Sequence, residues 1–145
     1  MNLSQHFTLE EATHSGLAIR LGITNQPSEA CIERMRDAAG QMEAVRTLLG
    51  GVKIWVTSWY RCLALNRALR SADTSAHIQG WAIDFVAPPF GTPLQVCRAI
   101  LDAHILMDQL IYEGSWVHIS FNPRGWQQAL TAHFSPTGVT YTQGI

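Results

Sequence analysis

Charged residues and long apolar runs are scarce in this chain of 145 residues. Only 14% of the residues are charged and the formal net charge is −1, so no basic surplus points to a nucleic-acid partner. No stretch approaches the roughly 18 consecutive apolar residues that cross a membrane, and the first residues lack the charged-then-apolar layout of a signal peptide. We therefore expect cytoplasmic synthesis, no membrane insertion and no nucleic-acid partner.

Cysteine is also rare: Cys31, Cys62 and Cys97 are an odd number at unrelated spacings. The absence of a CxxC pair excludes a cysteine zinc knuckle, and the odd count argues against a disulfide framework. We interpret the three as reduced, buried thiols. What the chain has in quantity is apolar: 47% of its residues are hydrophobic, five of them Trp, which indicates one packed domain over residues 1–145.

Hydrophobic periodicity predicts an α+β fold. Apolar residues at helical spacing predict helices, and runs rich in β-branched and aromatic residues predict strands. The predicted helices cover residues 9–14, 29–49 (after the cap Ser28), 62–70 and 92–104. The predicted strands cover residues 52–60, 81–87, 108–113 and 116–121. We expect a polar loop at 71–80 and one strand and a turn in the tail, so that helices pack against a mainly antiparallel sheet.

The stretch TSAHIQGWAIDF, residues 74–85, places Asp84 in the middle of an apolar strand. Burying a carboxylate is costly unless it is paired or holds a metal. His77 lies in the preceding loop, and His118 lies in another apolar strand. Separately, they have ordinary explanations as a salt-bridge partner, a surface loop residue and a core histidine. Together, two imidazoles and a carboxylate match a catalytic zinc site, in which water takes the fourth position.

Ser75 to Asp84, SAHIQGWAID, resembles the SxHxxGxAxD signature of the zinc D-Ala-D-Ala peptidase family. WVHIS resembles the family's second ligand segment, and VTSWYR its substrate-side strand. The opening HFTLEEATHSGLAIRLGITNQPS and DQLIYE are similar to the small single-domain branch carried by phages and prophages. The resemblance implies a fold like that of the D,D-peptidases and Hedgehog domains.

Carried over by position, the resemblance implies that His77, Asp84 and His118 bind Zn²⁺. Ser75 and Ser120 would then order the loops and hydrogen-bond around the ligands. Arg61 would bind a substrate carboxylate, since guanidinium offers a planar fork for two carboxylate oxygens. Without the family, Arg61 is equally well explained as a surface salt bridge.

The general base is where the chain departs from the family. Ser115 stands where some members have Glu, and Trp116 where others have His. Glu113 is the nearest carboxylate able to activate water at the metal, so we predict it as the base. Asp108 is the reserve candidate, although at a strand boundary it is more often structural.

Substitutions near Arg61 bear on substrate preference. Trp59 replaces the usual Gly of SGYR and is expected to line the cleft. Among the other aromatic residues, we expect most to be core and some to form a sugar-stacking platform. The six in question are Trp55, Trp59, Tyr60, Trp81, Trp116 and Trp126.

The resulting functional expectation is a monomeric zinc metallopeptidase that hydrolyses peptide bonds in the stem peptides of bacterial peptidoglycan. It would act as a D-Ala-type carboxypeptidase or endopeptidase, such as a phage endolysin released through a holin-type pore or carried on a virion. Two alternatives stay open. One is a non-catalytic zinc-containing binding or structural module, and the other is an intracellular D-Ala-D-Ala dipeptidase acting on free dipeptide.

Overall fold

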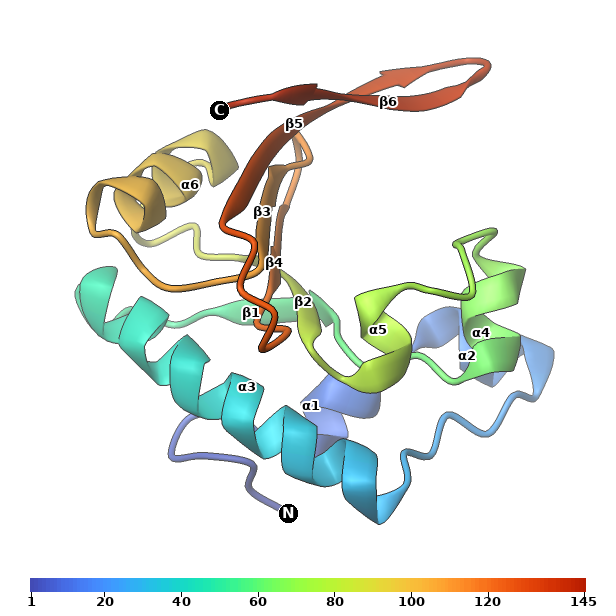
Figure 1. The fold of residues 1–145 in the computed structure, drawn as a ribbon. Coiled ribbons are helices and arrows are strands. Elements are labelled where there is room, and N and C mark those ends of the chain that lie inside the picture. The colour runs from blue at the N-terminus through green and yellow to red at the C-terminus, as the bar shows by residue number, and fades with distance from the viewer.

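The computed structural model describes residues 1–145 and contains several helices and a single sheet (Figure 1). The helices are α1 (Leu9–Thr13), α2 (Gly16–Leu21), α3 (Glu29–Leu48), α4 (Leu63–Ala68), α5 (Ala76–Gln79) and α6 (Pro93–Asp102). The strands are β1 (Trp55–Ser58), β2 (Ala82–Val86), β3 (Gln109–Tyr112), β4 (Val117–Ser120), β5 (Gln128–Ser135) and β6 (Gly138–Gln143). No helix is both long and apolar enough to span a membrane.

The six strands form one sheet in the order β1-β2-β4-β3-β5-β6. All neighbours are antiparallel except β3 and β5, which run parallel. The predicted α+β fold with a mainly antiparallel sheet is therefore confirmed.

The two faces of the sheet have different roles because side chains alternate along each strand. Ile83 and Phe85 of β2 are fully buried on one face, where they share a core with apolar side chains of α3 and α6. The opposite face carries Asp84 and His118, which are paired across β2 and β4. We call this second face the site face.

The long helix begins and ends close to where the sequence predicted. The Ser28 side chain caps α3 by accepting from the Cys31 N–H at 3.2 Å. Thr92 and Gln95 form a complete capping box at the start of α6.

All three cysteines are free thiols, but Cys62 is only half-buried, because its sulfur caps α4 instead of packing in the core.

Several local predictions are wrong. The expected loop 71–80 contains α5, and α2 was not predicted; both are too short for a periodic signal. Strand β1 is shorter than predicted, and the tail forms two strands, β5 and β6, instead of one. Most of the six aromatics are not in the core, since only Trp59 and Trp81 are buried. The Thr- and Gln-rich tail lacks the apolar alternation that would have revealed its second strand.

Candidate metal centre

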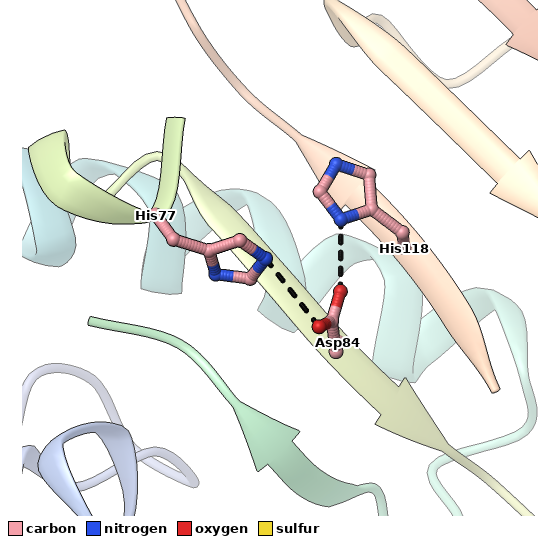
Figure 2. Close-up of side chains that lie close together, drawn as sticks. All are labelled: His77, Asp84 and His118. Atoms are coloured by element: carbon pink, nitrogen blue, oxygen red, sulfur yellow. Dashed lines mark hydrogen bonds and ion pairs between the residues drawn. The ribbon is translucent and has the colours of Figure 1, made fainter. Parts of the chain in front are cut away.

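Three side chains from separate elements meet on the site face (Figure 2). His77 comes from α5, Asp84 from β2 and His118 from β4, and their ligand atoms all lie within 4.8 Å of one another. His77 Nε2 lies 3.4 Å from Asp84 Oδ2, and His118 Nδ1 lies 2.8 Å from Asp84 Oδ1. The structure thus brings together all three residues that the sequence predicted as ligands.

A single helical turn, not a loop, holds His77 in place. Ser75 caps α5, and its hydroxyl accepts from the His77 N–H at 3.3 Å. Gly80 ends the turn with a left-handed φ of +83°, and a Cβ there would lie 2.6 Å from the Met35 side chain on α3. Glycine is therefore required at this position on two counts, conformation and space.

The hydrogen bond on the far side of the His77 ring selects its tautomer. His77 Nδ1 donates to the Trp59 carbonyl at 2.7 Å, which leaves the Nε2 lone pair directed at Asp84. Burial lowers the pKa of His77, which favours the neutral ring that a metal ion binds. The Trp59 indole donates in turn to the Gly80 carbonyl at 2.8 Å.

Trp59 does not line a cleft, so that prediction is wrong. Only 1% of the residue is exposed, and its ring packs edge-on against Phe7. Its backbone carbonyl, which orients His77, could not be predicted from the sequence. A carbonyl has no residue-type signature, so only the folded backbone could reveal it.

Asp84 provides the negative charge of the cluster. Burial alone would raise the pKa of this carboxyl, but the two histidines beside it, His77 and His118, outweigh burial and hold the pKa well below its usual range. An ionised carboxylate and two imidazole nitrogens, one with its tautomer fixed from behind, fit the ligand set of a catalytic zinc ion.

Arg61 lies beside the cluster and not on the open surface. Its NH2 group donates to Asp84 Oδ2 at 3.2 Å, and its Nε donates to the Ser58 hydroxyl at 3.0 Å. Burial lowers the pKa of Arg61, whereas the charges of Asp84 and Glu113 act in the opposite direction. A hollow of about 370 Å³ opens next to Arg61, between β1, α4 and the start of α2. It is lined by His14, Ser15, Gly16, Thr57, Ser58, Tyr60, Arg61, Leu65 and Leu69.

Glu113 directly follows β3 and belongs to the site face. Ile111 is paired with His118, so Glu113, two residues further on, projects to the same side. The residue is only 8% exposed, and burial raises the pKa of its carboxyl. The charge of Asp84 raises this pKa further, whereas the charges of His118 and Arg61 lower it. No hydrogen bond contributes to the shift. Glu113 is thus a buried carboxyl within electrostatic reach of the cluster.

Asp108 and Ser120 lie at the other end of the β3–β4 pair. Asp108 accepts from Arg124 Nε at 3.0 Å and from the Trp126 N–H at 3.1 Å, so its oxygens are already engaged. The buried Ser120 hydroxyl accepts from the Asn122 N–H at 3.4 Å. The structure therefore brings neither side chain into the group of candidate ligands.

No curated protein gives a match to this chain. The family model for Peptidase M15, a family of zinc-dependent metallopeptidases, matches residues 5–120. The matched range contains the three candidate ligands together with Arg61 and Glu113, and it ends before β5 and β6. Because the match covers most of its length, the chain belongs to the Peptidase M15 family.

Proposed function

We propose that this chain hydrolyses a D-Ala-type peptide bond in the stem peptides of bacterial peptidoglycan. The observation that carries the proposal is the meeting of His77, Asp84 and His118, flanked by a buried carboxyl, Glu113, and a half-buried guanidinium, Arg61. Peptide hydrolysis needs an activated water, a proton carrier and a group that orients the substrate, and these residues supply that set.

His77, Asp84 and His118 would hold the zinc ion, which when bound makes water a nucleophile at neutral pH and polarises the scissile carbonyl. Glu113 then takes a proton from the attacking water. The same carboxyl returns this proton to the leaving amine as the C–N bond breaks. Its raised pKa suits both steps, because an acid–base group works best when its pKa lies towards the working pH.

Arg61 would orient the substrate. Its position between Asp84 and the hollow lets unused N–H groups bind a carboxylate placed there. A terminal D-amino acid is small enough for such a space, which favours a carboxypeptidase mode. An endopeptidase mode would require the hollow to be open to a continuing chain.

The test combines zinc content with hydrolysis of purified peptidoglycan. We expect about one zinc per chain in the parent protein and almost none in His77→Ala or His118→Ala. His104→Ala, which removes a histidine outside the cluster, is the matched control. Unchanged zinc in the first two variants would show that the site is elsewhere.

Mass spectrometry of the released fragments then identifies the bond. Loss of single D-Ala residues indicates a carboxypeptidase, and separation of cross-linked stems indicates an endopeptidase of the endolysin kind. A zinc-loaded protein that releases no amino groups from any wall type would instead favour a non-catalytic module. Ser115 and Trp116, at the family's usual base positions, are the feature that makes this second outcome worth testing.

A further inference from the structure

The site face continues beyond the metal centre onto the C-terminal hairpin of β5 and β6. Ile111 of β3 is paired with Leu130 of β5, so Leu130 lies on the site face. Alternation along β5 then places Phe134 on that face, and the antiparallel partners of β5 place Val139 and Tyr141 there as well. The hairpin therefore extends the surface that carries His118.

This extension is apolar, aromatic and open to solvent. Phe134 is 59% exposed, Tyr141 49% and Val139 41%. Trp116, two residues before His118, has its ring 5.9 Å from that of Phe134, which shows that the two aromatics face the same side. We call Trp116, Phe134, Val139 and Tyr141 the aromatic strip. Contiguous exposed apolar side chains of this kind usually mark a binding surface.

The strip is continuous with the reacting centre. Glu113 directly follows Tyr112, which is paired with Thr131 of β5, and the residue after Thr131, Ala132, is paired with Tyr141. Burial raises the pKa of Tyr141, and the charges of Glu113 and Asp84 raise it further, so the phenol lies within their electrostatic reach. A substrate bound at the metal would therefore meet the strip as it leaves the site.

The order of groups across the sheet gives the substrate a direction. Arg61 and its hollow lie at the β1 end, the candidate ligands lie on β2 and β4, and the hairpin lies at the β6 end. If Arg61 binds the carboxylate on the leaving side, the acyl side of the scissile bond runs towards β5 and β6. In a stem peptide, that acyl side leads back to the glycan.

The distance between the candidate metal centre and the hairpin suits this arrangement. Strands lie about 4.8 Å apart, so β6 is roughly 14 Å from β4, and an extended peptide covers that span with about four residues. Stem peptides are chains of a few residues attached to an amino sugar. Aromatic rings offer flat apolar faces on which a sugar ring can stack.

We propose that the aromatic strip binds an amino-sugar ring of the glycan, so that the β5–β6 hairpin selects glycan-linked stem peptides over free ones. The inference rests on the proposed function. It concerns residues outside the range matched by the family model.

The experiment compares two ligands, a disaccharide-pentapeptide and the free pentapeptide, with zinc-loaded protein. We expect Phe134→Ala and Tyr141→Ala each to raise KM for the glycan-linked ligand about tenfold, with kcat and the free pentapeptide little affected. Phe90→Ala removes a similarly exposed ring before α6, and Thr140→Ala alters the opposite face of β6; both should leave KM unchanged. Circular dichroism confirms that each variant is folded.

Binding measured in Glu113→Gln separates this inference from the proposed function. In one outcome, the protein binds the glycan-linked ligand preferentially, Phe134→Ala removes this preference, and the parent hydrolyses nothing. That result would support glycan binding by the aromatic strip and contradict the proposed hydrolysis. Hydrolysis with equal KM for both ligands would support the proposed function and contradict glycan binding by the aromatic strip. A dimer in the parent that Phe134→Ala dissociates would show that the strip binds a second copy of the chain, and would overturn the inference. Absence of binding and of hydrolysis would contradict both proposals.

Discussion

Strand β3 has a buried carboxyl at each end, and the two carboxyls differ in the groups that surround them. Asp108 precedes the strand and is 1% exposed, while Glu113 follows it and is 8% exposed. Asp108 forms an ion pair with Arg124 and accepts the Trp126 N–H. Glu113 instead lies among the charges of His118, Asp84 and Arg61, and no hydrogen bond contributes to its pKa shift.

The comparison shows how neighbours decide what a buried carboxyl does. A carboxylate whose oxygens are engaged by a guanidinium and a backbone N–H stabilises the loop that carries them. A carboxyl whose pKa is raised by burial, next to a candidate metal centre, is suited to accept a proton and return it. We therefore expect changes at the Asp108 end to affect stability, and changes at the Glu113 end to affect turnover.

The largest expected effect is on turnover at the Glu113 end. Glu113→Gln keeps the shape of the side chain but removes the proton carrier, so we expect kcat to fall by about 10²–10⁴-fold. Zinc content should stay at the parent level, because Glu113 is not among the candidate ligands. Steady-state kinetics on a stem pentapeptide, with metal analysis of the same sample, measure both.

Asp108→Asn is the matched change at the other end of the strand. If it reduced kcat as much as Glu113→Gln does, the assignment of the base would be wrong. A loss of zinc in Glu113→Gln would equally show that this residue acts on the metal and not on the proton.

The second effect is on stability at the Asp108 end. Asp108→Asn removes the charge that faces Arg124, so we expect the free energy of unfolding to fall by about 1.5–3 kcal/mol. Urea unfolding monitored by Trp fluorescence measures it. Arg124→Gln tests the same ion pair from its other side and should give a similar loss, and a much smaller one would mean that the pair contributes little.

The site residues that belong to motifs with a fixed residue spacing could be predicted from the sequence. The spacing of SAHIQGWAID and the WVH segment led to His77, Asp84 and His118, and the structure places them together. Long elements such as α3 were also predictable, since twenty residues of helical periodicity and a Ser cap leave little ambiguity.

Features that depend on tertiary contacts could not be predicted. The turn α5 exists because Ser75 caps it and Gly80 fits against Met35, and a four-residue helix has no periodicity to detect. Trp59 was expected at the cleft because of its position in a motif, but its indole fills the core and its carbonyl orients His77. The strip on β5 and β6 depends on the register of the hairpin, which a polar, Thr-rich tail does not reveal.

The smallest effect, on the pH dependence of stability, sharpens the comparison most. Burial raises the pKa of Glu113 above its ordinary value of 4.5, so the folded protein binds this proton more tightly than the unfolded chain. Between the ordinary pKa and the folded one, the native state holds more protons, and the contribution of Glu113 to stability falls as pH rises. Asp84 acts in the opposite sense. Its pKa in the folded protein lies below the ordinary value of 3.8, so its contribution to stability is present above pH 3.8 and is lost as pH falls.

Glu113→Gln isolates the first of these contributions. In zinc-free protein, the stability of the variant relative to the parent should increase as pH rises above the ordinary pKa of 4.5, because the parent alone must ionise a buried carboxyl. Urea unfolding at several pH values measures the difference, and Glu33→Gln, at an exposed position of α3, is the control. A difference that stays constant with pH would mean that burial does not hinder ionisation of Glu113. The contrast between the two ends of β3 would then rest on hydrogen-bond partners alone.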